Sequence, residues 1–449
     1  MLAAALGELS PETWRQFLAG RRWFPAGARA VRLIGAAPVG EAAALALLAV
    51  EADRPWVCQA LLVEEAGLEG QDPGDRWMVA AGRRVVEASD APAAFSRLGP
   101  ALRAGGSFEG RAARWSAAPI GGAWPAGAGG ARRVGGEQSN SSVVLGESAL
   151  FKLFRRVEVG SHPELEIGRY LTARGFGYSP PLLSALTVET ADGVAAAGSV
   201  HVYLPGRVDG WARAISAGAE DMSREAATLG AATRALHEAL AADGDGPLAP
   251  RAVLAVDRAR WAEGLRAAAT GALERLRERS GRLRPQDREI AGFVAERGEG
   301  LIAEAEARLR AAAGVKIRIH GDYHLGQVLF DAAGGAWSIL DFEGEPSRPL
   351  AERALRQLPL RDVAGMLRSF AYAALVGGGG ARWEQAVSAA FLAGYDAAAA
   401  PGSPLPPAQG SPLLAACVVW RAFYELGYEL DYRPEQAWIP LTGLAAAVR

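Results

Sequence analysis

Two aspartates and one amide are spaced in this sequence so that they could act on a single reacting group. Asp322 closes an H-G-D triplet, and Gln327 follows five positions later, just before an apolar run. Asp341 ends a second apolar run. The two runs, 328–330 and 337–340, flank the turn-forming segment Asp-Ala-Ala-Gly-Gly and therefore predict a β-hairpin. Such a hairpin would bring Gln327 and Asp341 to one edge.

This order of carboxylates and amide is typical of phosphoryl transfer. In protein kinases, the first Asp accepts the proton of the attacking hydroxyl, and an amide and a second Asp hold Mg²⁺. By the same roles, Asp322 is the predicted catalytic base, and Gln327 and Asp341 are predicted metal ligands. An ordinary hairpin with polar strand ends is the alternative, but it does not explain why the amide and the second Asp occur together.

A segment rich in Gly and Ser, 134–145, could cover the phosphates of a nucleotide. Its backbone N–H groups and hydroxyls are the kind of donors that bind phosphate. It matches neither of the common glycine-rich nucleotide motifs, so a plain polar turn is the alternative. The candidate donors are Ser139, Asn140, Ser141 and Ser142.

Lys152 lies in the next strand-like run, where every neighbour is apolar. An unpaired ammonium there would be costly, so the position predicts an anionic partner. We expect that partner to be phosphate, with an acidic residue of the following helix holding the lysine, and we choose Glu166 over Glu164. The alternative is an edge-strand lysine that reaches solvent. Further on, the backbone of Val202 and Tyr203 is expected to contact adenine where the chain crosses between lobes.

Composition favours a two-lobed protein with a large core. The chain has 449 residues, half of them apolar, and a formal net charge of −2. No basic run suggests a nucleic acid partner, and no segment is long enough to span a bilayer. Cys58 and Cys417 are too few for a disulfide framework or a zinc site. The start of the chain is expected to be a short amphipathic helix instead of a signal peptide. We expect a cytoplasmic monomer.

The pattern of apolar residues and turns divides the chain into three regions. Residues 1–110 alternate short apolar runs with turns and predict a β-rich cap subdomain. Residues 111–205 are expected to form the rest of a nucleotide-binding N-lobe, with a Gly/Ala/Pro-rich linker or mobile loop at 119–130. Residues 206–449 are mainly helical and carry the hairpin; the expected helices are 221–241, 258–279, 287–313 and 383–400. An α+β, bilobal, protein-kinase-like fold is therefore predicted.

The chain resembles the bacterial maltokinase family, in the aminoglycoside-phosphotransferase-like branch of the kinase fold. The resemblance runs nearly end to end. It implies ATP as donor, Mg²⁺, an N-terminal cap over the small lobe and a sugar hydroxyl as acceptor. The segments that carry it include Arg22-Trp23-Phe24, Lys152-Leu153-Phe154-Arg155-Arg156, His320–Leu329, Leu340–Pro346 and Pro359–Ser369.

One C-terminal segment departs from that family. Maltokinases typically carry Leu-Asp-Lys before an Ala-x-Tyr-Glu segment, whereas this chain has Trp420 and Arg421 at the Asp and Lys positions. An indole at that position would narrow the pocket and offer a stacking face, so we expect an acceptor smaller than maltose. Core packing of Trp420 on an amphipathic helix is the alternative.

An amino sugar fits the acidic residues that follow. Glu425 and Glu429 lie one helical turn apart beside Tyr424. Carboxylates fix an ammonium by charge-assisted hydrogen bonds, and aromatic faces fix a sugar ring. We therefore predict a glucosamine kinase branch that converts D-glucosamine to glucosamine 6-phosphate. His324 and Glu343 are the remaining candidate sugar contacts.

Three other functions stay open. A maltokinase would make maltose 1-phosphate. An aminoglycoside phosphotransferase would need a longer acidic cleft than the C-terminal helix offers. A non-catalytic sugar sensor would be expected to lack Asp322, Asp341 or Lys152, and all three are present.

Overall fold

The computed structural model describes residues 2–25, 27–67, 76–121, 124, 130–134, 140–242, 244 and 246–448. Ser139 and most of the predicted loop at 119–130 lie outside these residues. The chain forms two compact units. Unit 1 comprises Met1–Pro205 and Arg348–Ala354, and unit 2 comprises Gly206–Ser347 and Leu355–Arg449.

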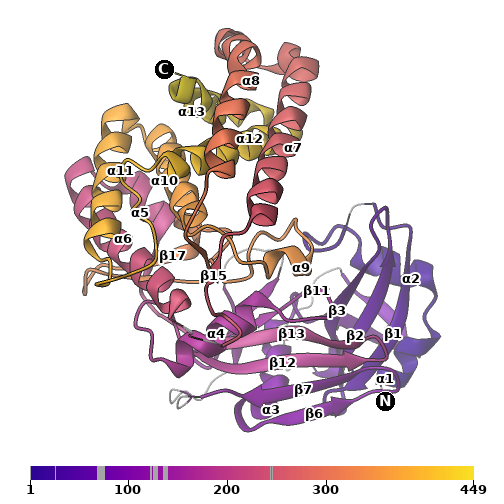
Figure 1. Ribbon diagram of the computed structural model, residues 1–449. Coiled ribbons are helices and arrows are strands. Elements are labelled where there is room, and N and C mark those ends of the chain that lie inside the picture. The colour runs from indigo at the N-terminus through magenta and orange to yellow at the C-terminus, as the bar shows by residue number, and fades with distance from the viewer. Residues whose placement is uncertain are drawn as a thin grey trace. The chain divides into compact units, whose positions relative to one another are not determined.

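The first sheet of unit 1 is antiparallel and is covered by the N-terminal helices α1 (Leu2–Ala5) and α2 (Pro11–Leu18) (Figure 1). Helix α2 begins at Ser10, whose hydroxyl accepts from the N–H of Thr13, and it buries Trp14 and Phe17. The strand order is β1 (Ala30–Pro38), β2 (Ala43–Glu51), β3 (Trp56–Glu64), β5 (Arg83–Glu87) and β4 (Met78–Ala80), with β11 (Arg156–Val157) also paired to β3.

The second sheet of unit 1 carries the strand of Lys152. The one strand of this sheet that lies before residue 110 is β6, whereas the first sheet takes β1 to β5 from that part of the chain and β11 from residues 156–157. Helix α4 (Pro163–Ala173) packs on β12 and β13. The strand order is β6 (Gly106–Glu109), β7 (Arg114–Pro119), β12 (Leu182–Thr190), β13 (Gly193–Val202), β10 (Ala149–Leu153), β9 (Ser141–Leu145) and β8 (Ala131–Arg133).

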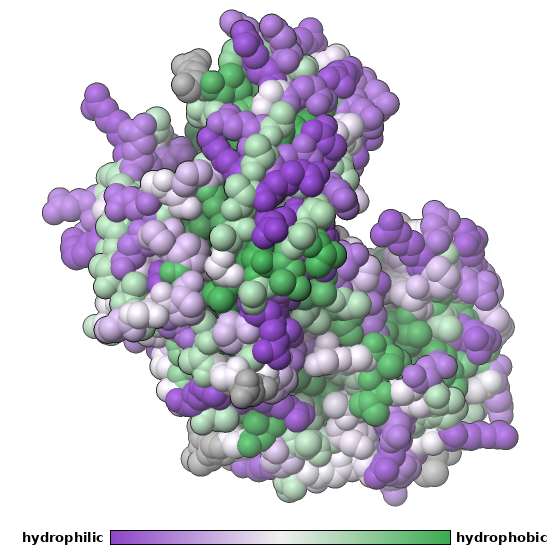
Figure 2. Space-filling model, viewed as in Figure 1, coloured by the Kyte–Doolittle hydropathy of each residue, from purple (hydrophilic) through white to green (hydrophobic). Residues whose placement is uncertain are grey.

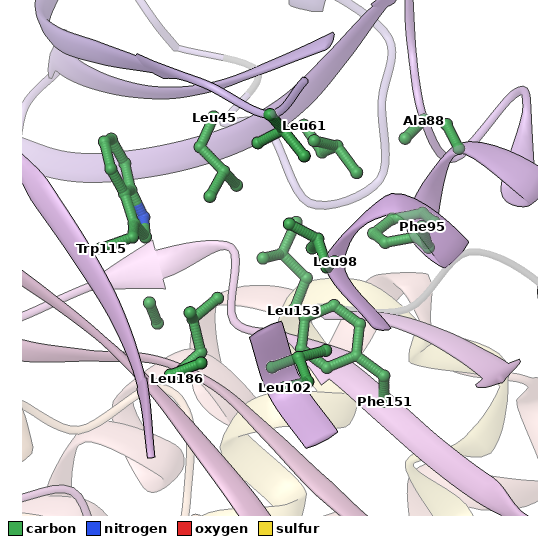
Figure 3. Packing of buried hydrophobic residues seen from close by; sticks show 14 of the residues in the cluster. Leu45, Leu61, Ala88, Phe95, Leu98, Leu102, Trp115, Phe151, Leu153 and Leu186 are labelled. Atoms are coloured by element: carbon green, nitrogen blue, oxygen red, sulfur yellow. The ribbon is translucent and has the colours of Figure 1, made fainter. Parts of the chain in front are cut away.

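The two sheets share one hydrophobic core. Leu45 and Leu61 of the first sheet point toward Phe151 and Leu186 of the second, and all four are fully buried (Figure 3). The short helix α3 (Gly99–Ala104) and the 3-10 segment η3 (Pro92–Leu98) contribute further apolar side chains to the same cluster. The first sheet is therefore packed as part of unit 1 and is not a separate domain.

Unit 2 is mainly helical, and the four helices expected from the sequence are confirmed with ends shifted by up to three residues. On the face shown in Figure 2, the helices α7 and α8 carry mostly hydrophilic side chains outward. The helices are α5 (Gly210–Ser216), α6 (Ala219–Ala241), α7 (Ala255–Arg279), α8 (Arg288–Arg310), α10 (Leu360–Val376), α11 (Gly380–Ala397), α12 (Pro412–Tyr432) and α13 (Trp438–Val448). Helix α9 (Leu350–Arg353) belongs to unit 1.

Two small sheets complete unit 2. One has the order β14 (Val208–Asp209), β17 (Val328–Asp331) and β18 (Ala336–Ile339), and the other pairs β15 (Arg251–Ala252) with β16 (Val315–Lys316). Among the described residues, none of the helices combines the length and the apolar character that crossing a membrane requires. The predicted α+β class is confirmed.

Candidate active site

The hairpin predicted around the metal ligands is present. Strands β17 and β18 pair antiparallel, from Val328 opposite Ile339 to Asp331 opposite Ala336. The N–H of Leu340 then donates to the carbonyl of Gln327 at 2.9 Å. This bond fixes the residue before Asp341 beside Gln327, as the sequence pattern predicts.

Asp341 has an unusual backbone conformation. Its φ is +64°, and Ala81 is the one other described non-glycine residue with positive φ. Holding such a residue in the left-handed region costs about 1–3 kcal/mol, and such strain is concentrated at functional sites. The strain at the end of β18 therefore supports a functional role for Asp341.

Asp362 of α10 fixes the loop that carries Asp322 by hydrogen bonds to the loop backbone. The carboxylate of Asp362 accepts from the backbone N–H groups of His320 at 2.7 Å and Gly321 at 2.9 Å. His237 of α6 also donates to it, at 3.2 Å. Burial acts to raise the pKa of Asp362, but the hydrogen bond and charge of His237 outweigh it and hold the pKa below its usual value. Asp362 thus fixes the loop as a buried anion.

The side chain of His320 joins this loop to the hairpin. One ring nitrogen, Nε2, donates to the carbonyl of Leu340 at 2.7 Å, and the other accepts from the N–H of Asp322 at 3.4 Å. The predicted base is therefore tied through His320 to the residue before Asp341.

Asp322 has two polar side chains beside its carboxylate. Arg421 Nη2 lies 3.3 Å from Oδ1, and His324 Nε2 lies 3.8 Å from Oδ2. His324 Nδ1 accepts from the N–H of Gly326 at the start of the 3-10 turn η6 (Leu325–Gln327). Burial lowers the pKa of His324, and the charge of Asp322 opposes this shift without cancelling it. His324 is therefore neutral at pH 7.

A cavity of about 740 Å³ in unit 2 opens onto Asp322. Its wall combines acidic and aromatic side chains with two arginines, so it offers a polar ligand both carboxylate and guanidinium groups. Of the predicted sugar contacts, five line it: His324, Arg421, Tyr424, Glu425 and Glu429. Further lining residues are Trp211, Glu345, Tyr372, Tyr428 and Arg433.

The two glutamates of α12 differ in what they can still bind. Glu425 accepts from Arg368 Nε at 2.9 Å and lies 3.4 Å from Arg421 Nε, so both of its oxygens face cations. Glu429 Oε1 accepts from Tyr372 at 3.0 Å and from Arg433 at 2.7 Å. Among the described residues, the buried Oε2 of Glu429 has no hydrogen-bond partner. A buried carboxylate oxygen without a donor is costly, so this atom indicates a ligand that donates to it.

Glu345 is an acidic residue of the pocket that the sequence analysis did not select. It accepts from the Ser347 hydroxyl at 2.6 Å and forms a side-chain hydrogen bond with Tyr424. Burial raises the pKa of Tyr424, and the charge of Glu345 raises it further, so the phenol stays protonated and donates. Glu343, which we predicted instead, is buried and does not line the cavity within the described part of the chain.

Trp420 also lies away from the cavity lining formed by the described residues. Its indole packs against Gly264 of α7, and the guanidinium of Arg361 lies 4.2 Å from its ring centroid. A Cβ at position 264 would come within 2.9 Å of the indole, so the glycine makes room for the ring. The structure therefore places Trp420 in helix packing, and the predicted narrowing of the pocket by its indole is wrong.

On the nucleotide side, Lys152 is central in the second sheet, opposite Ser142 of β9 and Ser199 of β13. Its charge acts on Glu164, which is fully buried and pairs with His201 at 3.0 Å. Burial acts to raise the pKa of Glu164, but Lys152 and His201 together hold it far below the usual range.

Glu166, the residue chosen from the sequence, is half-buried in the same first turn of α4 as Glu164. Glu164 is therefore a second candidate for the carboxylate beside the lysine, and the choice of Glu166 stays a prediction.

The other nucleotide candidates are held by protein groups. Asn140 Oδ1 accepts from the N–H of Arg155, and Ser141 Oγ accepts from its guanidinium. The N–H groups of Val202 and Tyr203 donate to the backbone carbonyls of residues 181 and 148. None of these particular donors and acceptors is therefore directed at adenine or phosphate in this structure.

The candidate metal ligands are few and carry oxygen donors. No group of three His, Cys, Asp or Glu side chains that could hold a metal occurs among the described residues. Mg²⁺ typically takes one or two protein oxygen ligands and completes its shell with phosphates and water. The carboxylate of Asp341 and the amide oxygen of Gln327, adjacent at the end of the hairpin, fit that pattern.

An Asp-bearing loop beside a hairpin that ends in an amide and a second Asp is typical of phosphotransferases, and comparison with known families agrees. The chain belongs to the phosphotransferase enzyme family, whose model matches residues 130–402.

Curated relatives narrow the comparison. A glucosamine kinase of Streptacidiphilus jiangxiensis is 33% identical over 252 residues, which cover 52% of each chain. A glucosamine kinase of Mycolicibacterium smegmatis is 31% identical over 55% of this chain and 60% of that one. The chain thus spans about half the length of the curated relatives it matches.

A solved structure shows the same fold over the whole chain. A glucosamine kinase in complex with glucosamine, ADP and inorganic phosphate superposes with a TM-score of 0.69 at 24% identity, covering 100% of this chain and 99% of that one. The predicted kinase-like fold is confirmed.

Proposed function

We propose that this protein is an ATP-dependent sugar kinase that converts D-glucosamine to glucosamine 6-phosphate. Its similarity to two curated glucosamine kinases supports this function. The observation that carries the choice of an amino sugar is Glu429, a residue of the cavity wall whose buried Oε2 has no donor among the described residues. The ammonium of glucosamine supplies a charged donor for that atom.

Asp322 is the proposed catalytic base. It accepts the proton of the sugar hydroxyl as the hydroxyl oxygen forms a bond to the γ-phosphorus, and the bond from that phosphorus to the β–γ bridging oxygen breaks to release ADP. Gln327 and Asp341 would hold Mg²⁺, which neutralises charge on the transferring phosphoryl group. Neutral His324 lies beside Asp322 and can donate to the incoming sugar.

Lys152 is the proposed contact for the ATP phosphates, with Glu164 holding it in place. Ser139 and Ser142 remain proposed phosphate donors, and Ser142 lies directly opposite Lys152. For Val202 and Tyr203, contact with adenine is proposed through their carbonyl groups, because their N–H groups are already used.

Maltose is the second candidate acceptor, for a specific reason. Trp420 does not narrow the cavity, and about 740 Å³ is enough for a ligand larger than one sugar ring. This observation removes the steric argument against a disaccharide. Maltose, however, offers Glu429 only uncharged hydroxyl donors, whereas glucosamine offers a charged ammonium.

An ADP-release assay decides between these acceptors. Purified full-length protein with Mg-ATP is offered glucosamine, N-acetylglucosamine, glucose, maltose and an aminoglycoside. We expect glucosamine to have the highest kcat/KM, and N-acetylglucosamine to be poor because its nitrogen carries no charge. Higher kcat/KM for maltose would replace the proposal with a maltokinase, and no turnover of any sugar would favour the sensor.

The Glu429 carboxylate predicts a pH dependence that is specific to the amino sugar. Burial raises the pKa of Glu429 above its usual value, and Glu425 raises it further. As the pH falls through that raised pKa, Glu429 takes up a proton and loses its charge. We therefore expect kcat/KM for glucosamine to fall on acidification at a pH above the ordinary glutamate value. Initial rates measured from about pH 8 to about pH 5 check this. A Glu429→Gln variant with the same acid limb would contradict the assignment.

A further inference from the structure

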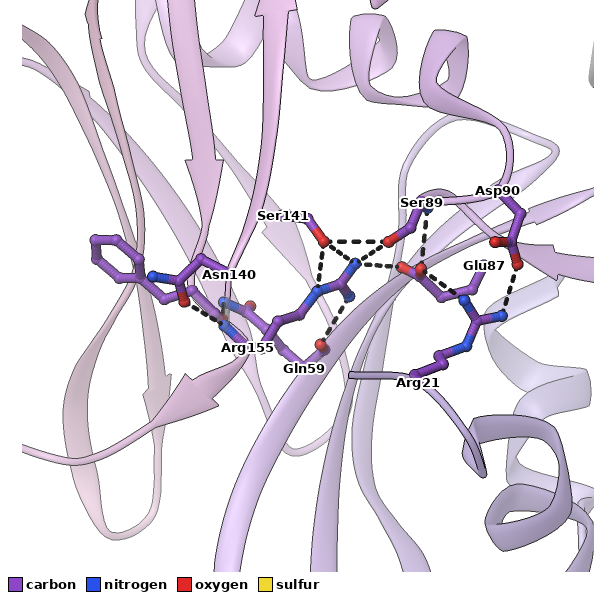
Figure 4. Close-up of polar contacts among 9 residues, drawn as sticks. Arg21, Gln59, Glu87, Ser89, Asp90, Asn140, Ser141 and Arg155 are labelled. Carbon is purple, nitrogen blue, oxygen red and sulfur yellow. Dashed lines mark hydrogen bonds and ion pairs between the residues drawn. The ribbon is translucent and has the colours of Figure 1, made fainter. Parts of the chain in front are cut away.

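A buried chain of charges joins the first sheet of unit 1 to the strands of Lys152 (Figure 4). Arg155 and Glu87 are both fully buried, and Arg155 Nη2 lies 2.9 Å from Glu87 Oε1. Arg21 Nη1 lies 3.6 Å from Glu87, and Arg21 Nη2 lies 2.7 Å from Asp90. Two arginines and two acidic residues therefore balance in charge.

The other end of this chain of charges lies on the nucleotide side. Arg155 Nη2 donates to Ser89 and to Ser141, both at 2.6 Å, and Arg155 Nε donates to Ser141 at 2.9 Å. The backbone N–H of Arg155 donates to Asn140 at 3.2 Å. One guanidinium thus connects Glu87 and Ser89 of the cap with the start of β9.

The position of Arg155 links this connection to Lys152. Arg155 follows Lys152 by three residues, and Ser141 is the partner of Leu153 in the β9–β10 pairing. Any shift of the guanidinium would therefore be transmitted to both strands that place Lys152 and Ser142. The Trp23 ring, 4.4 Å from the guanidinium carbon, closes the remaining side.

Stability alone is a weak reason for such an arrangement. Burying ion pairs costs desolvation energy that their attraction repays only partly, and apolar replacements of similar volume are often as stable. A buried polar network of fixed geometry can instead hold the strands that it connects in one defined conformation.

We propose that Arg155 and Glu87 are positioning residues through which the cap fixes the phosphate-binding strands β9 and β10. This inference rests on the proposed nucleotide site, and it gives the first sheet a role in ATP binding. The sugar-binding residues all belong to unit 2, so the effect of this pair is confined to the nucleotide.

The test uses Glu87→Gln, which keeps the shape of the side chain but removes its charge. We expect the Kd for Mg-ADP, measured by calorimetry on the full chain, and the KM for ATP each to rise about tenfold. The KM for glucosamine and kcat at saturating ATP should stay within about twofold of wild type. A purely structural role would lower the folded fraction without this split.

Two further variants keep the test decisive. Ser141→Ala removes the two hydrogen bonds that Arg155 donates to Ser141, and it should raise the KM for ATP even if Glu87→Gln does not fold. Glu64→Gln is the matched control, because it breaks the 2.7 Å ion pair with Arg83 inside the first sheet and leaves β9 and β10 untouched. It should leave the Kd for Mg-ADP unchanged.

The outcomes separate this inference from the function on which it rests. Wild-type protein that binds no Mg-ADP would remove the proposed kinase activity itself. Wild-type protein that binds Mg-ADP, together with folded Glu87→Gln and Ser141→Ala variants that bind it equally well, would overturn the positioning role alone.

Discussion

We expect replacement of Asp322 with asparagine to lower kcat about a thousandfold and to leave the KM values for ATP and sugar within about threefold of wild type. The amide keeps the size of the carboxylate but cannot accept the proton of the sugar hydroxyl. Substrate binding survives because Lys152, Glu429 and Tyr424 are unchanged. Steady-state ADP release with glucosamine, at saturating concentrations of both substrates, measures the loss.

Asp331→Asn is the matched control for this substitution. Asp331 lies in the turn of the same hairpin, where its Oδ1 accepts from the N–H groups of Ala333 and Gly334, and an asparagine oxygen can accept the same bonds. Its kcat should equal that of wild type. If Asp322→Asn keeps more than about a tenth of the wild-type kcat, then Asp322 is not the base.

We expect replacement of Glu429 with glutamine to lower kcat/KM for glucosamine about fiftyfold, mostly because KM rises. Hydrogen bonds to charged groups contribute about 1.5–3 kcal/mol, and the variant loses the charge that pairs with the ammonium. The loss for glucose should be several times smaller, because a hydroxyl has no charge to pair. Initial rates with both sugars, measured side by side, give the ratio.

Glu435→Gln provides the comparison for an acidic residue outside the cavity. Glu435 lies on the exposed 3-10 turn η7 (Pro434–Gln436), close in sequence to Glu429. It should change neither kcat/KM value. An equal loss of kcat/KM for glucosamine and glucose in Glu429→Gln would mean that Glu429 maintains the structure of the pocket but does not bind the ammonium of the sugar.

The hairpin could be predicted because all of its signals are local. Alternating apolar residues, a Gly-containing turn and an Asp at the strand end lie within one short segment, 327–341. The strain at Asp341 could not be predicted, because a positive φ at a non-glycine residue is imposed by the surrounding fold.

Trp420 was wrongly placed in the pocket because helical spacing shows which residues share a face of a helix, but not which part of the protein packs against that face. Trp420 and Tyr424 are four apart and were therefore expected to share the pocket. Helix α12 packs against α7 and α10 as well as lining the cavity, so its faces have different neighbours. Gly264, which receives the indole, lies far away in sequence and carries no signal of that contact.

The sequence could not decide between Glu164 and Glu166 for a related reason. Both stand in the first turn of α4, and which of them is buried depends on how the helix packs on β12 and β13. The role of Arg155 was hidden in the same way, since Glu87 and Ser89 come from a part of the chain that sequence spacing cannot connect to it. Long-range polar contacts are the part of this site that only the structure provides.

The pairing of β11 with β3 limits how this chain can be divided. The polypeptide leaves the strand of Lys152, returns to the first sheet at Arg156 and pairs there with Cys58. A fragment cut to residues 130–402 would lack β3 and leave Phe151 and Leu186 without their packing partners. We expect that fragment to aggregate, and the two sheets of unit 1 to unfold in one cooperative step.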